Sequence, residues 1–312
     1  MKKILILIVL VFLNTYASAD RLVKNGFLNN EMGYEMDQNI NDPKNKIILI
    51  LNHGQDDHDK KSKDCYYSNN ISNFSLLVGT KINEKELMVY NLCTENLVGD
   101  DWRNLWIGEN KRKKPYKGKT KLEKRLDKNL ELIEMLISIG VPKNQIIMAG
   151  NSCGGWLTMM LISKYPNKIG GGISINQACY GKQSKERIVK KNGVEKALTK
   201  FAKLEPGPAK MRQNQIDEIS KSKNLPVLVF THPKDPYDGL LSDWVEEIPG
   251  ITRVIISNDR TINGKKCLRK GLKKNGKEWK KKLKNPHYIW EADCFQYYNP
   301  TILDYISSRV SS

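Results

Sequence analysis

A serine lies between glycines at the point where an apolar run meets a helical pattern. The run Ile146 to Gly150 is strand-like, and Asn151-Ser152-Cys153-Gly154-Gly155 follows it directly. This is the Gly-x-Ser-x-Gly spacing of a nucleophile elbow, in which a sharp strand-to-helix turn exposes the serine hydroxyl. Such a turn needs small residues on both sides of the serine, and glycines meet that need. The pattern therefore predicts that Ser152 is a nucleophile.

A nucleophilic serine needs a general base, and the base needs an acid that orients it. The chain has four histidines, of which His232 and His287 follow the serine. The apolar run Leu225 to Thr231 ends just before an acidic turn that contains Asp235 and Asp238. Asp235 has the better spacing for the acid, and Asp238 is the alternative. His287 lies beyond the last expected strand and before the last expected helix, so the chain order is serine, acid, histidine.

Alternating strand and helix patterns must position these groups. Apolar runs predict at least six strands, at Lys46–Asn52, Leu87–Leu92, Gln145–Gly150, Gly172–Asn176, Pro226–Thr231 and Thr252–Ser257. Apolar residues at helical spacing predict helices at Leu122–Ile137, Gly154–Tyr165, Pro208–Ser222 and Thr301–Arg309. This alternation predicts a mostly parallel central sheet with helices on both faces.

Two less regular regions each follow an expected strand. Gln55 to Asn73 is polar and loop-like, and Lys182 to Leu204 contains an amphipathic stretch where a small cap could be inserted. Loops at the carboxyl ends of strands form the binding crevice of open α/β sheets. Both regions could therefore shape a substrate pocket, and ordinary surface loops are the equally weighted alternative.

From Lys46 to Arg309 the chain resembles the α/β-hydrolase superfamily, in particular its dienelactone-hydrolase-like and esterase/peptidase-like branch. The resemblance rests on Asn52-His53-Gly54 after the early strand, on Gly150 to Gly155, and on the Asp235 turn. It implies the α/β-hydrolase fold.

The same resemblance implies a role for each candidate residue. Ser152 would be the nucleophile, Asp235 the acid and His287 the base. The backbone N–H groups of Gln55 and Cys153 would form the oxyanion hole, which stabilises the charge that develops on the substrate carbonyl oxygen.

The position of His287 departs from the family pattern. Family members usually carry this histidine directly before the terminal helix, where the chain reads Glu291-Ala292-Asp293-Cys294-Phe295. A loop that folds back could still bring the imidazole to Ser152. Otherwise His287 is a surface residue and the triad is degenerate. Of the two earlier histidines, His53 is expected to brace the oxyanion loop and His58 to be solvated.

The first residues have the pattern of a secretory signal peptide. A basic start, the apolar run Ile4 to Leu13 and the small residues Ala17-Ser18-Ala19 predict cleavage after Ala19. The expected organisation is a signal peptide at 1–19 and a single α/β-hydrolase domain at 20–312, in the periplasm or secreted. No segment is long and apolar enough to be a membrane helix.

Six cysteines in an exported chain predict disulfides. The expected pairs are Cys65–Cys93 and Cys267–Cys294, while Cys153 and Cys179 either pair or remain buried thiols. The spacings do not match a Cys/His metal site, so no metal is expected. The chemistry expected at the serine needs no cofactor.

The formal net charge of +18 is densest between Lys265 and Lys284. A basic patch can attract nucleic acid or an anionic surface. However, lysines are spread along the whole chain, and the dense segment has a single aromatic residue, Trp279, rather than a platform on which bases could stack. We expect a solvated basic surface and no specific nucleic-acid partner.

The expected function is hydrolysis of small or polymeric carboxylic esters through an acyl-enzyme on Ser152. A serine peptidase on the same fold and a non-catalytic binding protein on a hydrolase scaffold are the alternatives. In a depolymerase variant, Trp102 and Trp106 would lie exposed beside the cleft, although burial is the commoner fate of such residues. The sequence does not predict the oligomeric state.

Overall fold

The computed structural model describes most of the chain from residue 25 onward. The described residues are 25–28, 34–35, 40–54, 72–94, 119–180, 186–204, 206–237, 239–256, 261–262, 265–272 and 278–311. The expected signal peptide at 1–19 and most of the polar region 55–73 lie outside them, as do Trp102 and Trp106. The signal peptide and the domain limits therefore stay predictions.

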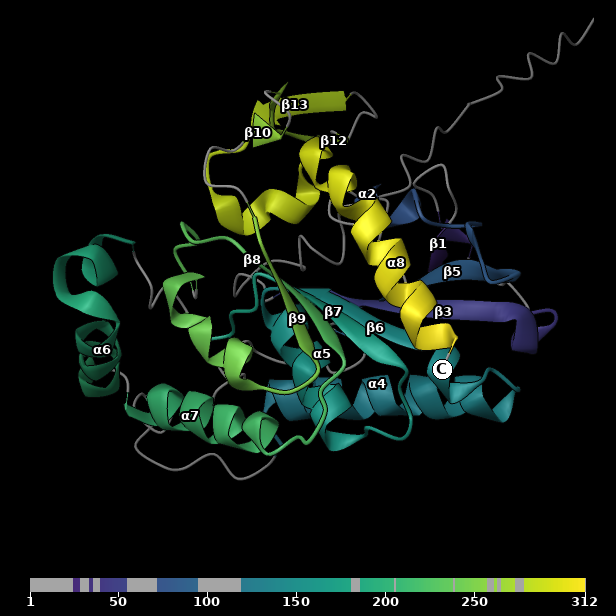
Figure 1. Ribbon diagram of the computed structural model, residues 1–312, viewed down its shortest axis with the longest axis horizontal. Coiled ribbons are helices and arrows are strands. Elements are labelled where there is room, and N and C mark those ends of the chain that lie inside the picture. The colour runs from purple at the N-terminus through teal and green to yellow at the C-terminus, as the bar shows by residue number, and fades with distance from the viewer. Residues whose placement is uncertain are drawn as a thin grey trace, which may run out of the picture.

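A nine-stranded sheet forms the centre of the molecule (Figure 1). Its main path runs β2-β1-β5-β3-β6-β7-β8-β9, and β4 pairs with β5 at one side. The strands from β5 to β9 along this path are parallel, whereas β1, β2 and β4 pair antiparallel. The strands are β1 Gly26–Leu28, β2 Tyr34–Glu35, β3 Lys46–Asn52, β4 Lys81–Ile82, β5 Lys85–Leu92, β6 Ile146–Asn151, β7 Gly171–Ile175, β8 Val227–Thr231 and β9 Ile251–Ile255.

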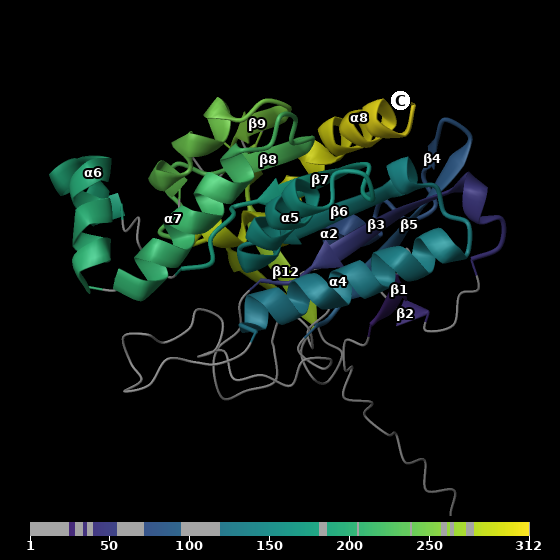
Figure 2. The same ribbon diagram turned by 90° about the horizontal axis from the view of Figure 1, so that it is seen from below.

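Helices cover both faces of this sheet. Figures 1 and 2 show α4, α5 and α7 on one face and α8 across the other. The α-helices are α2 Ser72–Ser75, α4 Lys121–Ser138, α5 Cys153–Lys164, α6 Glu186–Leu204, α7 Pro206–Ser220 and α8 Asn299–Val310. Short 3-10 helices are η1 Pro43–Asn45, η4 Lys143–Gln145, η5 Gly239–Leu241, η6 Asp243–Glu247, η7 Pro286–Glu291 and η8 Asp293–Tyr298. The expected mostly parallel sheet with helices on both faces is confirmed.

The central strand β3 is buried on both faces. Ile48 and Ile50 pack with the core that includes Leu122 of α4, while Ile47 packs with the core that includes Ile302 of α8. A strand with two buried faces needs apolar residues at successive positions rather than alternate ones. This is why the apolar run of β3 could be assigned to a strand from sequence.

Helix α4 extends one residue beyond the predicted range at each end. The Thr120 side chain accepts from the Glu123 N–H and the Glu123 side chain accepts from the Thr120 N–H, which makes a capping box. Gly140 follows the helix with a φ of 103°, a left-handed conformation that favours glycine.

The lysine-dense segment contains strands that the sequence analysis did not predict. It forms two small antiparallel sheets, β10 Thr261–Ile262 with β11 Lys265–Lys266 and β12 Leu268–Leu272 with β13 Glu278–Lys282. The expected disulfide Cys267–Cys294 is present and ties the residue just before β12 to η8. Figure 1 shows these sheets standing off the main sheet.

The region in which a cap was expected forms α6, between β7 and β8 in the chain. Gly193 interrupts the helix with a non-helical φ of 78°. α6 packs against α7 and η5, at one edge of the molecule (Figure 1).

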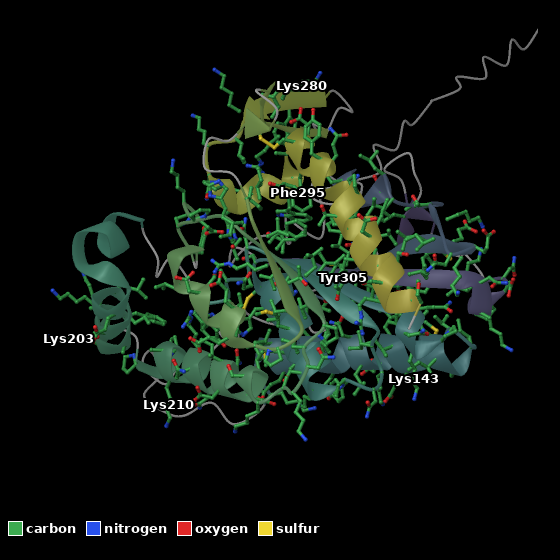
Figure 3. All side chains as sticks on the ribbon, in the orientation of Figure 1. Lys143, Lys203, Lys210, Lys280, Phe295 and Tyr305 are labelled. Atoms are coloured by element: carbon green, nitrogen blue, oxygen red, sulfur yellow. A yellow bond between two sulfur atoms is a disulfide. The ribbon has the colours of Figure 1, made fainter. Side chains whose placement is uncertain are left out.

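Basic side chains point outward on several sides of the molecule. Figure 3 shows Lys280 at the top, Lys143 at the lower right, and Lys203 and Lys210 at the lower left. Phe295 is buried and Tyr305 is partly buried. Among the described residues, no helix has the length and apolar character needed to span a membrane.

Candidate active site

Ser152 sits at the turn between β6 and α5, as its motif predicts. Its backbone has φ 55° and ψ −122°, a combination that non-glycine residues rarely adopt. Such strained backbones persist at functional sites because the surrounding structure holds them. With the parallel sheet and its flanking helices, this strand–serine–helix elbow makes the fold that of an α/β-hydrolase.

The glycines of the elbow are required by close backbone packing. A Cβ atom on Gly150 would lie 2.3 Å from the carbonyl group of Gly154. A Cβ on Gly154 would lie 2.2 Å from the carbonyl oxygen of Asn52, at the end of β3. Because neither distance leaves room for a side chain, α5 can approach the sheet only with glycine at both positions.

The loop after β7 holds Ser152 in place. The Ser152 N–H donates to the carbonyl of Ile175 at 3.0 Å, and the Ala178 N–H donates to the Ser152 carbonyl at 3.2 Å. The Ser152 hydroxyl donates to the Ala178 carbonyl at 3.0 Å. The serine side chain is 9% exposed. Ser152 is thus largely buried, and its hydroxyl is oriented by a backbone carbonyl.

The structure brings Asp235 and His287 into direct contact. Nδ1 of His287 lies 2.7 Å from Oδ2 of Asp235, and both side chains are buried. The other carboxylate oxygen, Oδ1, accepts from the Tyr237 N–H at 2.7 Å. Since Nδ1 faces a carboxylate, Nε2 is the ring nitrogen left to exchange a proton. Asp238 lies outside the described residues.

His287 reaches Asp235 from η7 rather than from the residue just before the last helix. The Asn285 side chain accepts from the His287 N–H at 3.0 Å and begins η7. η8 then separates η7 from α8. The ring centroid of His287 lies 4.2 Å from that of Tyr237, beside the acid turn. His287 is therefore not a surface residue, although no hydrogen bond between described residues joins it to the Ser152 hydroxyl.

The other described histidines are engaged elsewhere. His53 follows β3, where its Nδ1 lies 2.7 Å from the Gly54 carbonyl and its Nε2 lies 3.0 Å from Oγ1 of Thr94. His232 is buried, and its Nδ1 accepts from the Lys234 N–H at 3.0 Å. His58 lies outside the described residues. These contacts agree with a bracing role for His53 rather than with a base.

Two polar residues of α4 fasten the segment that leads to Gln55. The buried Arg125 donates to the carbonyls of His53 and Gly54, and Asn129 donates to Oδ1 of Asn52 at 2.9 Å. Sequence analysis missed both, although a signal was present: they lie on the otherwise apolar face of α4. Gln55 itself lies outside the described residues, so its place in the oxyanion hole stays a prediction.

Cys153 begins α5 directly after the serine. Its N–H belongs to the first turn of the helix, where no carbonyl one turn earlier can accept from it and where the helix dipole favours negative charge. Cys153 forms a disulfide with Cys179, which settles a pairing that the sequence left open. Cys93 is also disulfide-bonded. Cys65 lies outside the described residues, so the pair Cys65–Cys93 stays a prediction.

Aromatic residues pack behind the elbow, on the side of α7. Oε1 of Gln215 accepts from Nε1 of Trp156 at 2.6 Å and from the Tyr180 hydroxyl. Burial raises the pKa of Tyr180 well above its ordinary value, so this hydroxyl stays protonated and donates. The interlocked contacts fix the position of α7 beside α5.

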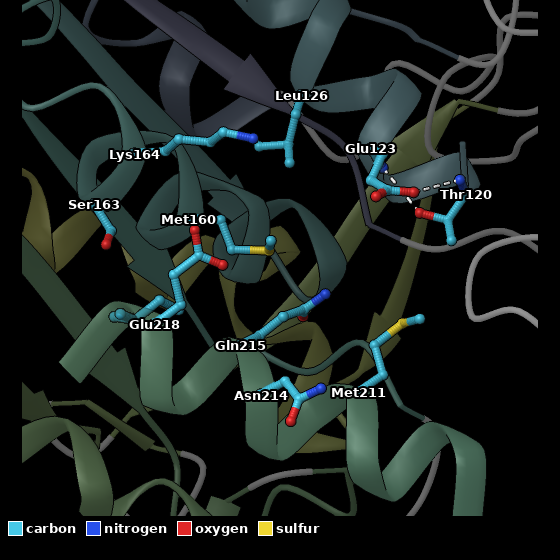
Figure 4. A pocket seen from close by; sticks show the side chains of 11 residues that line it. Thr120, Glu123, Leu126, Met160, Ser163, Lys164, Met211, Asn214, Gln215 and Glu218 are labelled. Atoms are coloured by element: carbon cyan, nitrogen blue, oxygen red, sulfur yellow. Dashed lines mark hydrogen bonds between the residues drawn. The ribbon is translucent and has the colours of Figure 1, made fainter. Parts of the chain in front are cut away.

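A pocket of about 220 Å³ lies between α4, α5 and α7 (Figure 4). Its walls include Glu123, Met160, Met211 and Glu218, but none of the predicted site residues. Among the described residues, no group of three or more His, Cys, Asp or Glu side chains is arranged to hold a metal ion.

Comparisons with known proteins find likeness in structure alone. No protein-family model and no curated protein sequence matches the chain. Brefeldin A esterase, a bacterial homologue of human hormone-sensitive lipase, is 12% identical with a TM-score of 0.49, over 94% of this chain and 79% of its own. A fungal esterase from Rhizomucor miehei is 14% identical with a TM-score of 0.47, over 86% and 77%. An esterase of Pyrobaculum calidifontis is 13% identical with a TM-score of 0.47, over 93% and 86%. Structural similarity at such low sequence identity and TM-score does not indicate the function of this chain.

Proposed function

We propose that the protein is a serine hydrolase that cleaves carboxylic esters. The observation that carries the proposal is the pair of features at one end of the sheet: a serine on a strained elbow, and a buried histidine whose Nδ1 lies 2.7 Å from a carboxylate. A buried imidazole oriented by a carboxylate is what a serine hydroxyl needs to become a nucleophile.

In the proposed first step, the Ser152 hydroxyl rotates away from the Ala178 carbonyl and its oxygen attacks the carbonyl carbon of the ester. Nε2 of His287 takes the hydroxyl proton, and Asp235 holds the ring through Nδ1 and stabilises its positive charge. The N–H groups of Cys153 and Gln55 donate to the carbonyl oxygen as it becomes negative.

In the proposed second step, the tetrahedral intermediate collapses and the bond to the alcohol oxygen breaks. His287 gives its proton to the leaving alcohol, which leaves an acyl group on Ser152. A water molecule then attacks the acyl carbon while His287 removes a proton from that water. The bond to the Ser152 oxygen breaks, His287 gives the proton to that oxygen, and the acid is released.

We propose further that the protein works outside the cytoplasm. The support is the amino-terminal signal pattern together with the disulfides Cys153–Cys179 and Cys267–Cys294. Disulfides persist in oxidising compartments and are rare in the cytosol. Small or polymeric esters in the periplasm or outside the cell are the proposed substrates.

Steady-state hydrolysis of a panel of p-nitrophenyl esters tests the function. We expect turnover by the wild type and none above background for Ser152→Ala. His287→Gln and Asp235→Asn should each lower kcat by about a thousandfold or more, because removal of one triad member leaves only the binding and oxyanion contributions. Cleavage of peptide amides without cleavage of esters would overturn the proposed substrate class. A wild type without activity on either would point to a binding protein.

A further inference from the structure

Asn176 lies directly after β7, beside the strand that ends in the elbow. Its backbone φ is 44°, a left-handed conformation in which asparagine is enriched among the non-glycine residues. Its N–H donates to the carbonyl of Phe230 in the neighbouring strand β8 at 2.8 Å. The residue is 4% exposed. Its side chain is therefore fixed at the carboxyl ends of β7 and β8, where the candidate catalytic residues gather.

The Asn176 amide bonds to two separate loops at once. Oδ1 accepts from the His232 N–H at 3.1 Å. Nδ2 donates to the carbonyls of Pro286 and His287, at 3.1 and 3.4 Å. These backbone partners fix the assignment of Oδ1 and Nδ2 in the Asn176 amide, because an N–H can only donate and a carbonyl can only accept.

These two loops are the ones that carry the acid and the base. His232 begins the acid turn, and its carbonyl accepts from the Asp235 N–H at 2.8 Å. Pro286 and His287 form the start of η7, far along the chain from the acid turn. A single buried amide thus joins the backbone of both loops, independently of the bond between the Asp235 and His287 side chains.

We propose that Asn176 is a positioning residue for the proposed hydrolysis: it sets how the base loop lies against the acid turn. This inference rests on the proposed function of Asp235 and His287. This role accounts for the early position of His287, because a base in η7, which η8 separates from α8, needs an anchor that a base just before α8 would not. Misplacement by about 1 Å can cost about 100-fold in rate.

Two substitutions separate this role from simple support of the turn. Asn176→Asp keeps the shape, the acceptor for the His232 N–H and a residue that tolerates left-handed φ. It replaces the donor with an oxygen that faces two carbonyls. Asn176→Gly keeps the backbone conformation and removes all three side-chain hydrogen bonds without adding charge. If Asn176 served only the left-handed turn, Asn176→Gly would behave as the wild type.

Asn83 supplies a matched control on the other side of the molecule. It is also an asparagine with left-handed φ, at 48°, in the turn between β4 and β5. Its amide also joins distant segments, since Nδ2 donates to the Ser311 hydroxyl at 2.6 Å. Asn83→Gly therefore makes the same chemical change away from the candidate site.

The test measures kcat and KM on p-nitrophenyl acetate for the three variants and the wild type. We expect Asn176→Asp and Asn176→Gly each to lower kcat by about 100-fold with KM within threefold. Asn83→Gly should stay within twofold in both constants. A kcat within twofold of the wild type for both Asn176 variants would overturn the inference.

A second readout needs no activity and so separates this inference from the proposed function. The Nδ1 proton that His287 shares with Asp235 should give a far-downfield proton NMR signal, assigned by its loss in His287→Gln. We expect the signal in the wild type and in Asn83→Gly, and its loss or broadening in both Asn176 variants. If the wild type hydrolyses no ester, the proposed function fails while this signal still tests the inference. An unchanged signal in folded Asn176→Gly would contradict it.

Discussion

At the scale of single residues, the resting hydrogen bond of Ser152 sets the first requirement of the proposed chemistry. The hydroxyl donates to the Ala178 carbonyl, so it must rotate about one side-chain bond before it can give its proton to His287. Exchange of one hydrogen bond for another costs about 1 kcal/mol at most. Binding of an ester beside the elbow can supply this free energy, so the observed orientation of the Ser152 hydroxyl is compatible with catalysis.

Backbone contact at the elbow leads to a prediction about Gly154. The substitution Gly154→Ala forces a Cβ to 2.2 Å from the Asn52 carbonyl oxygen, so α5 must move off β3. We expect it to lower the free energy of unfolding by about 3 kcal/mol or more and to remove the reactivity of Ser152. Urea unfolding measures the first effect.

Gly79→Ala is the matched control for that substitution. Gly79 has a positive φ of 82° but open space around its Cβ position. Alanine there should cost about 1 to 2 kcal/mol through backbone strain alone and leave Ser152 unaffected. A smaller loss of stability in Gly154→Ala than in Gly79→Ala would show that close packing at the elbow is not what requires glycine.

Residue types and chain order were enough to predict Ser152, Asp235 and His287 as candidates. They could not predict the role of Asn176, because an asparagine after a strand is common. Its hydrogen bonds join two loops that are distant in the sequence and come together only in the folded protein. They could not decide between Cys153–Cys179 and two thiols either, since pairing depends on distance in space.

At the scale of elements, α4 does more than cover the sheet. Arg125 donates to the carbonyls of His53 and Gly54, and so ties the helix to the segment that leads into the proposed oxyanion donor Gln55. A buried guanidinium placed on backbone carbonyls is unusual, because charge is costly to bury without strong hydrogen bonds. Its contacts suggest that it orients this segment.

We therefore predict that Arg125→Met lowers kcat by about 10- to 100-fold with little change in KM, because a displaced oxyanion donor stabilises the transition state less. Arg309→Met is the control. Arg309 also donates to a backbone carbonyl, that of Gly170 at 2.9 Å, but from α8 to the residue just before β7. Equal losses of kcat in the two variants would contradict a specific role for Arg125.

The pairing of β3 with β5 carries a prediction about pH. Lys46 lies opposite Glu86 in the parallel register, and its Nζ donates to Oε2 at 2.7 Å. This hydrogen bond holds the pKa of Glu86 below its ordinary value. A lowered pKa in the folded state means that the pair stabilises the protein above the unfolded-state pKa, and that this is lost as pH falls through the folded-state pKa.

Because Glu86 is about a third exposed, solvent limits the effect to about 0.5 kcal/mol. Glu86→Gln should lower the free energy of unfolding by about that amount at neutral pH and leave it unchanged once Glu86 is protonated in the wild type. Urea unfolding at neutral pH and at a pH below the folded-state pKa of Glu86 measures the two differences in free energy. An equal loss at both values would mean that the ion pair is not responsible.

Elements buried on both faces were the easiest to predict from sequence. β3 was predicted with both its bounds, and the other five predicted strands differ from the structure by one or two residues at one or both ends. The short strands β1, β2 and β4 lacked enough residues for a pattern. β12 and β13 were missed because lysines at adjacent positions hide the alternation by which a strand is recognised.

At the scale of the whole molecule, positive charge is in excess. The formal net charge is +18, and the lysines labelled in Figure 3 point outward on several sides of the molecule. Like charges spread over a compact surface repel one another and destabilise the folded state. The repulsion belongs to the whole surface rather than to one site.

This excess predicts a salt dependence of stability. Raising sodium chloride from about 20 mM to about 200 mM shortens the screening length and should raise Tm. Differential scanning calorimetry measures the change. Potassium chloride at the same concentrations is the control, since screening depends on ionic strength and not on which monovalent cation supplies it. A Tm that falls with added salt would mean that attractive ion pairs outweigh the repulsion.

Covalent labelling of the mature protein with a fluorophosphonate, followed by peptide mass mapping, tests the central claim most directly. The account predicts that one phosphonyl group attaches to Ser152, because only an activated hydroxyl displaces fluoride from such a probe. Labelling should be absent in Ser152→Ala and strongly slowed in His287→Ala, while Asn83→Gly should label as the wild type. A folded wild type whose Ser152 stays unmodified would contradict the claim that this serine is an activated nucleophile.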